Sequence, residues 1–231
     1  PEAIRCLTPL LADPAYALRA EANIGSSLLM LGLSRPAQKF LDRALRRDPH
    51  FLPALLSRLK VLRVEQRDEE LVDLCGPIVE RWPQEEEVWN LWVSALRATG
   101  REERALEVVE LWLTQRPESL EGHLLAAELL SNRGDNEQAV VSLGRALRLD
   151  PTSEKVYAHL SVVMIRMRRH EAGLQYLDKA LAINPDSFIN HCRKAMVLWL
   201  TANWREAAVF YGKVAAMRPN SAVYRLNHHL L

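Results

Sequence analysis

Two sets of large apolar residues return along this chain every 34 residues. The first set is Leu28, Leu62, Leu96, Leu130, Met164 and Leu198, and the second includes Leu41, Val109, Leu143, Leu177 and Tyr211. Small residues return in the same way, at Gly25, Ala127, Ser161 and Ala195 near the first set and at Ala37, Ala105, Ala139, Gly173 and Ala207 near the second. Large residues facing small ones at helical spacing allow two helices to interdigitate. The pattern therefore predicts a repeated pair of packed helices, A and B.

Prolines mark the end of each predicted pair. They stand at Pro49, Pro83, Pro117, Pro151, Pro185 and Pro219, and each successive difference is 34. Proline cannot continue a helix and disfavours helical dihedrals in the residue before it. Asp48, Asp150 and Asn184 directly precede their prolines, where a short turn-forming side chain fits. We expect a turn after every helix B.

A second break falls midway between the prolines. Gly32, Gly100 and Gly134 each lie 17 residues before a proline, and Gln66, Arg168 and Ala202 occupy the same place in the other copies. Glycine adopts the left-handed conformation that ends many helices at low cost. These positions predict the tight turn between helix A and helix B.

The resulting frame predicts six full units and two partial ones. The full units are 18–51, 52–85, 86–119, 120–153, 154–187 and 188–221; residues 1–17 form a partial repeat with a lone helix B, and 222–231 begin a further repeat or a capping helix. Both ends look cut, as in a segment of a longer protein. The second unit is degenerate, because Leu59 and Leu71 replace small residues and Pro77 falls inside helix B. The third carries Trp112 where its neighbours have alanine.

Over residues 18–221 this pattern resembles the tetratricopeptide repeat (TPR) family. The resemblance implies an all-α fold, a right-handed α-solenoid (superhelix) of antiparallel helix pairs whose A helices line a concave groove. It also implies a non-catalytic scaffold that binds a partner protein or an extended peptide there. The groove-facing candidates in this frame are Arg19, Asn23, Lys60, Arg63, Asn90, Arg97, Glu128, His159, Arg166, Arg193 and Trp199.

Two other roles stay open. One is a substrate-recruiting arm of a larger enzyme, such as a glycosyl-, sulfo- or methyltransferase, or of a bacterial polysaccharide-export assembly. Self-association through open solenoid ends is the other alternative. The carboxylate clamp of chaperone-binding TPR domains is incomplete, because only Asn23 sits at a suitable position and Pro53 and Ser57 do not supply the rest.

Composition narrows the partners further. With 30 Lys and Arg against 29 Asp and Glu the net charge is +1, which argues against a nucleic-acid partner. No apolar run reaches the roughly 18 residues that span a bilayer, so we expect no direct membrane insertion. The three cysteines have no metal or disulfide spacing, which favours a reducing, cytoplasmic location and leaves a periplasmic one open.

Catalytic motifs do not emerge from the sequence. His123, His159 and His191 lie in different A helices without metal-binding spacing, and we interpret them as structural. The sequence has no glycine-rich phosphate loop and no nucleophile elbow. We therefore predict no catalytic residue, no cofactor and no metal within these residues.

Overall fold

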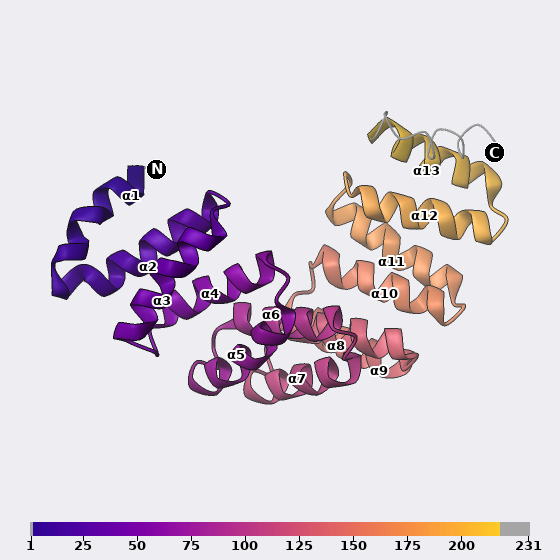
Figure 1. The fold of residues 1–231 in the computed structure, drawn as a ribbon. Helices are drawn as coiled ribbons and strands as arrows, with labels where there is room; N and C mark the ends of the chain where they lie inside the picture. Colours follow the sequence, from indigo (N-terminus) through magenta and orange to yellow (C-terminus); the bar gives the residue numbers. More distant parts are fainter. Residues whose placement is uncertain (1, 218–231) are drawn as a thin grey trace. The chain divides into compact units, whose positions relative to one another are not determined.

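The computed structural model describes residues 2–217, and every regular element in that range is a helix (Figure 1). The predicted all-α repeat array is confirmed. The residues separate into two compact units, unit 1 (Pro1–Arg116) and unit 2 (Pro117–Leu231), which are treated one at a time. The further repeat or capping helix expected at 222–231 lies outside the described residues.

Unit 1 begins with a short helix and continues as pairs of antiparallel helices. Its elements are α1 (Glu2–Leu7), a 3-10 helix η1 (Thr8–Ala12), α2 (Pro14–Met30), α3 (Ser34–Arg47), α4 (Leu52–Val64), α5 (Asp68–Arg81), α6 (Glu86–Ala98) and α7 (Glu102–Gln115). The A helices are α2, α4 and α6, and the B helices are α3, α5 and α7.

Unit 2 repeats the same arrangement. Its described elements are α8 (Leu120–Arg133), α9 (Asn136–Leu149), α10 (Glu154–Arg166), α11 (His170–Ile183), α12 (Phe188–Leu200) and α13 (Trp204–Met217). The A helices α8, α10 and α12 each pack most extensively against the B helix that follows. Buried alanines and one glycine (Ala139, Ala146, Gly173, Ala180, Ala207) allow this close approach.

The turn between helix A and helix B is left-handed in every described pair, as the glycine positions predict. The backbone φ is +76° at Gly32, +73° at Gly100 and +100° at Gly134. Gln66, Arg168 and Ala202 adopt the same conformation without being glycine, with φ of 58°, 62° and 60°. The following N–H reaches back to close the helix; Leu33 donates to the Leu28 carbonyl at 2.9 Å, for example.

The turn before each helix A carries a second recurring contact. Side chains 34 residues apart donate to the carbonyl of the proline six residues earlier: Trp89 to Pro83 (2.9 Å), His123 to Pro117 (2.9 Å), Tyr157 to Pro151 (3.0 Å) and His191 to Pro185 (2.7 Å). At Pro49 and at Pro151, the preceding aspartate accepts a backbone N–H from the turn. The turn at Pro151 therefore has both contacts.

The N-terminus differs from the predicted lone helix B over the first residues. The structure has α1 followed by the 3-10 helix η1, and the first helix A already begins at Pro14 instead of residue 18. The reason is local: the Asp13 carboxylate accepts the Ala15 N–H at 2.9 Å, and proline suits the first position of a helix.

The second and third pairs of unit 1 pack differently from the others. Leu59 and Leu71 are both buried, and α5 packs more extensively against α6 than against α4. Two leucines where other repeats have small residues hold α4 and α5 apart. In the third pair, the Trp112 ring stacks on the Trp89 ring with 6.0 Å between ring centroids, and this aromatic contact accommodates the larger side chain.

Candidate partner-binding site

Three of the four consecutive pairs of A helices within the units contact one another across repeats. In unit 1, α2 contacts α4 and α4 contacts α6, and in unit 2, α8 contacts α10. Comparable contacts between consecutive B helices are absent from the described residues. A stack that is tighter on its A side must curve toward that side. The A helices therefore line the inner side of each unit.

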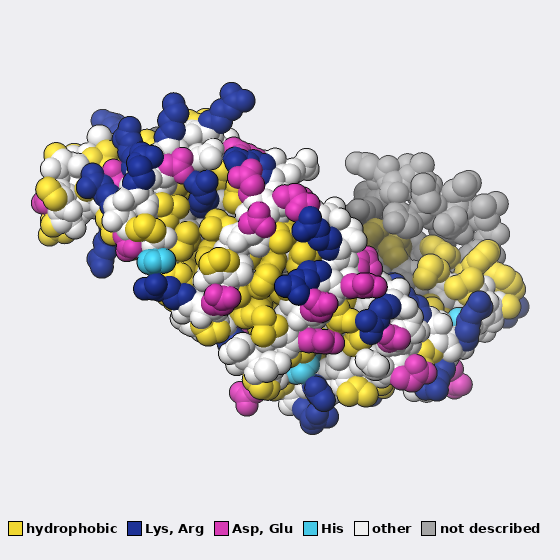
Figure 2. Space-filling view, turned by 60° about the horizontal axis from the view of Figure 1, so that its bottom comes forward, with side chains coloured by type: hydrophobic (Ala, Val, Ile, Leu, Met, Phe, Trp, Pro, Cys, Tyr) yellow, Lys and Arg dark blue, Asp and Glu magenta, His cyan; other side chains and the backbone are white. Residues whose placement is uncertain are grey.

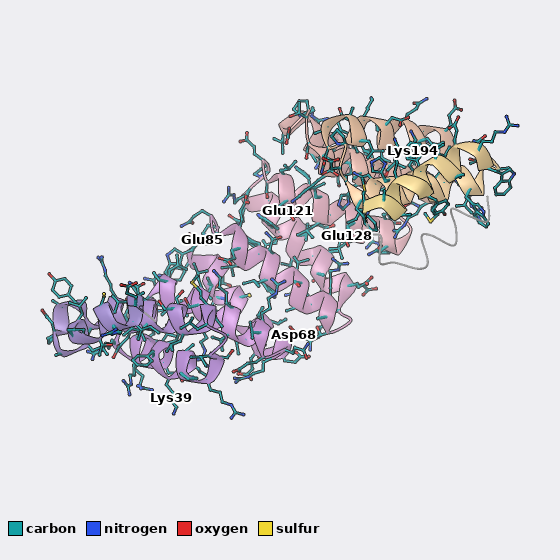
Figure 3. The ribbon with its side chains drawn as sticks, turned by 90° about the horizontal axis from the view of Figure 1, so that it is seen from above. Lys39, Asp68, Glu85, Glu121, Glu128 and Lys194 are labelled. Atoms are coloured by element: carbon teal, nitrogen blue, oxygen red, sulfur yellow. The ribbon has the colours of Figure 1, made fainter. Side chains whose placement is uncertain are left out.

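Unit 2 has a cavity on this inner side. It encloses about 200 Å³ and is lined by residues of α8, α10 and α12, namely Ala127, Glu128, Ser131, Asn132, His159, Val162, Val163, Arg166 and Arg193. Four of the predicted site residues (Glu128, His159, Arg166 and Arg193) are brought together here. Figure 3 labels Glu128 on α8, together with Glu121, which lies two turns earlier on the same helix.

Arg166 joins two of the cavity's helices. It lies at the end of α10, and its guanidinium donates to the Ser131 hydroxyl and to the Asn132 side-chain oxygen, each at 2.9 Å. The Ser131 hydroxyl in turn donates to Asn136 at 2.9 Å. Ser131 lines the cavity but is not among the residues that the sequence predicts, because nothing in its helical position shows that a neighbouring repeat supplies an arginine.

Arg193 reaches the cavity from α12. Its guanidinium donates to the side-chain oxygen of Asn190 at 3.2 Å. The amide of the buried Asn190 donates to Glu154, which also accepts from Ser187 at 3.1 Å. Burial lowers the pKa of Arg193, while the nearby Glu154 raises it. This chain fixes a partly desolvated positive charge at the cavity wall, where electrostatic interactions are stronger than in water.

His159, one of the residues that α10 contributes to the cavity, is half-buried. Burial is the largest cause that lowers its pKa; Glu128 and Glu121 act in the opposite direction, and Arg193 and Lys155 lower it further. The imidazole is therefore neutral at pH 7. With two arginines and one glutamate around it, the lining carries one excess positive charge.

Comparisons with known proteins agree with this architecture. Residues 130–191 match the family model described as tetratricopeptide repeat. The fold is similar to a chain of the APC/C hetero-tetramer Cut9–Hcn1 (TM-score 0.71, 13% identity, covering 99% of this chain and 45% of that one). It is also similar to a tetratricopeptide repeat protein of Parabacteroides merdae (TM-score 0.71, 13% identity, covering 92% of this chain and 98% of that one).

Residues 130–191 thus match the tetratricopeptide repeat, and the described residues as a whole form a helical repeat array with the fold of TPR proteins. A third similar structure is YrrB, a TPR protein described as having an unusual peptide-binding site (TM-score 0.61, 19% identity, covering 81% of this chain and 97% of that one). At these identities the likeness to solved structures concerns the fold alone. The array spans less than half of the matched Cut9–Hcn1 chain.

The remaining predicted site residues of the TPR array do not line the cavity. In unit 1, Lys60 forms an ion pair with Glu87 at 3.0 Å, and the Asn90 amide donates to the Glu86 carbonyl of its own helix at 3.1 Å. The other unit 1 candidates also lie on A helices: Arg19 and Asn23 on α2, Arg63 on α4 and Arg97 on α6. In unit 2, Trp199 packs edge-on against Trp204 with centroids 5.9 Å apart and stays 46% exposed.

Two histidines of the TPR array have structural positions. His123 and His191 are buried and bond to proline carbonyls through Nε2, so this nitrogen carries the proton. Their buried Nδ1 atoms have no partner among the described residues. Burial lowers the pKa of His123, as expected for a ring whose second nitrogen would gain an unpaired buried proton.

Among residues 2–217, no group of three or more His, Cys, Asp or Glu side chains is placed to hold a metal ion. No helix there has both the length and the apolar character needed to cross a membrane.

Proposed function

We propose that this TPR array is a non-catalytic scaffold that binds a segment of a partner protein on the inner, A-helix side. The observation that carries the proposal is the cavity of unit 2, which is lined by α8, α10 and α12 and contains charged, polar and apolar side chains. Binding sites typically combine an apolar concave surface with a few fixed polar groups that set the ligand's orientation. TPR repeats generally mediate protein interactions and lack chemistry of their own.

The lining favours an extended segment that places one acidic group in the cavity. Hydrogen bonds to Ser131, Asn132 and Asn190 already restrict Arg166 and Arg193, so these side chains lose little conformational entropy when a ligand binds. Their excess positive charge over Glu128 matches a single carboxylate. Arg19, Asn23, Lys60, Arg63, Asn90, Arg97 and Trp199 are proposed as further contacts along the A-helix side of their own units.

Filling the cavity tests the proposal. Val162→Trp adds a large side chain to the cavity wall without changing the charge. Val141→Trp makes the same change on α9 at a residue that is 57% exposed and lies on a B helix. We expect partners captured by wild-type protein and by Val141→Trp to be lost with Val162→Trp, as measured by quantitative affinity-capture mass spectrometry.

The captured partner then allows a direct measurement. Overlapping peptides from its sequence, titrated into both variants by calorimetry, should show one peptide that discriminates between them by about tenfold or more. If every captured protein binds both variants equally, the cavity of unit 2 is not the recognition site. Charge reversal at Arg63 and Arg97 in the same assay tests the inner side of unit 1.

A further inference from the structure

The B helix α3 carries a row of exposed cations outside the A-helix site. They are Arg35, Lys39, Arg43, Arg46 and Arg47, here called the basic stripe. Spacings of three and four residues place side chains on one side of a helix. The row from Arg35 to Arg46 extends about 17 Å along the helix axis. Figure 2 shows Lys and Arg side chains gathered over this N-terminal part of unit 1.

Most of this charge is uncompensated. Arg47 pairs with the buried Glu21 at 2.9 Å, and Arg43 lies over the Phe40 ring at 5.2 Å. The one acidic residue of α3, Asp42, is paired with Arg58 from α4. Among the described residues, Arg35, Lys39 and Arg46 have no carboxylate partner. Like charges at this spacing destabilise a helix, so the unpaired cations Arg35 and Lys39 add no stability to α3.

The repeat frame shows that the stripe is specific to α3. One repeat later, on α5, the positions of Arg35, Lys39 and Arg46 are occupied by Glu69, Asp73 and Glu80. Three repeats later, on α9, only the second half of the stripe is kept, as Arg145 and Arg148, both of which are exposed. The charge at these surface positions therefore changes from positive to negative between α3 and α5, two adjacent B helices of unit 1.

A hollow lies beside the stripe. It encloses about 490 Å³ and is lined by Leu11, Glu21, Arg43, Arg46 and Arg47, which come from η1, α2 and α3. It sets an apolar side chain next to guanidinium groups. A ligand that reaches it can bury a small apolar group while its acidic groups meet the arginines.

We propose that the basic stripe and its hollow bind an acidic helical segment of a partner protein, about three turns long. Charge complementarity requires carboxylates at intervals of three and four residues, which one face of a helix supplies. The length follows from the stripe itself, which extends about 17 Å along α3. Figure 3 shows Lys39 and Asp68, the first residue of α5, on the same side of unit 1. A long polyanion or an anionic membrane lying on this side would meet like charge at Asp73 and Glu80 of α5, although Glu69 is paired with Arg101.

A defined peptide tests the proposal. The probe is a fluorescein-labelled, capped, alanine-based helix of about 18 residues with glutamates at i, i+4, i+8 and i+11. A second peptide of equal composition distributes the glutamates around the helix. We expect the first to bind wild-type protein more tightly, with an affinity that falls as salt is added, because the contacts are exposed charge pairs. Fluorescence anisotropy measures both affinities.

The chain offers a matched control for the surface. Arg43→Glu with Arg46→Glu should weaken binding of the first peptide by about tenfold or more. Arg145→Glu with Arg148→Glu makes the same change at the equivalent positions of α9 and should change it by less than about twofold. Arg47 stays unchanged, so Glu21 keeps its partner. If the double reversal impairs folding, as judged by circular dichroism, glutamine replacements at Arg43 and Arg46 take its place.

Several results would overturn the proposal. One is equal weakening by both double variants, which means that net charge alone attracts the peptide. Equal affinity for the two peptides, or no binding at low salt, also excludes a helical acidic ligand. Tighter binding to duplex DNA or to phosphatidylserine vesicles, with the same loss on α3 reversal, assigns the stripe to a polyanion. If the protein dimerises and the Arg43→Glu, Arg46→Glu variant does not, the basic stripe binds a second copy of the chain.

Discussion

Replacing two stacked tryptophans by phenylalanine separates packing from hydrogen bonding in unit 1. Trp89 and Trp112 are both buried, with 1% and 0% of their surface exposed, and their rings lie 6.0 Å apart. The Trp89 indole N–H donates to the Pro83 carbonyl at 2.9 Å. The Trp112 indole nitrogen has no acceptor among the described residues. The same substitution therefore removes a hydrogen bond at one site and a buried unpaired donor at the other.

The expected costs follow from these contacts. Shrinking the ring costs each variant on the order of 1–2 kcal/mol of unfolding free energy. Trp112→Phe also removes an unpaired buried N–H, which returns about 1–3 kcal/mol and leaves a net effect near zero. Trp89→Phe loses a hydrogen bond worth a further 0.5–1.5 kcal/mol or so. Trp89→Phe should thus be less stable than Trp112→Phe by at least about 1 kcal/mol.

Urea unfolding followed by far-UV circular dichroism measures the difference, since tryptophan fluorescence changes with the substitutions themselves. Because repeat arrays can unfold in more than one step, native-state hydrogen exchange of the α6 and α7 amides supplies a local free energy as well. Equal losses in the two variants, or a larger loss for Trp112→Phe, would refute the reasoning and show that the proline contact contributes nothing.

Two further predictions concern helix packing and pH. Gly144→Ala should increase the free energy of unfolding by about 0.5–1 kcal/mol and so raise the urea midpoint, because a Cβ at this position meets no atom within 4 Å. Gly25→Ala should lower the urea midpoint, because its Cβ would lie 2.7 Å from the buried Leu41 side chain. The reverse order of midpoints would contradict this account. Burial lowers the pKa of both His123 and His159, so stability should be level above the unfolded value of about 6.5 and should fall as pH drops below it. Urea midpoints from pH 8 to pH 5 measure this slope, and a variant with glutamine at both positions should show a smaller one.

Local sequence determined the repeat itself. The helix ends could be predicted because each depends on a backbone constraint that one residue carries: a proline that ends helix B, or a left-handed position that ends helix A. The left-handed conformation even extends to Gln66, Arg168 and Ala202, which hold the glycine position without being glycine. Asp13 with Pro14 shows the limit, since a local cap started a helix four residues ahead of the 34-residue frame.

Only the tertiary structure decided which residues act together. The A-helix frame placed Glu128, His159, Arg166 and Arg193 on the inner side, but their convergence on one cavity depends on how repeats stack and on where long side chains reach. The same frame treated Lys60 as available, whereas the adjacent repeat pairs it with Glu87. Helix periodicity is local and is set by the chain alone. Contacts between repeats join residues about 34 positions apart, and their geometry is fixed only when the helices pack.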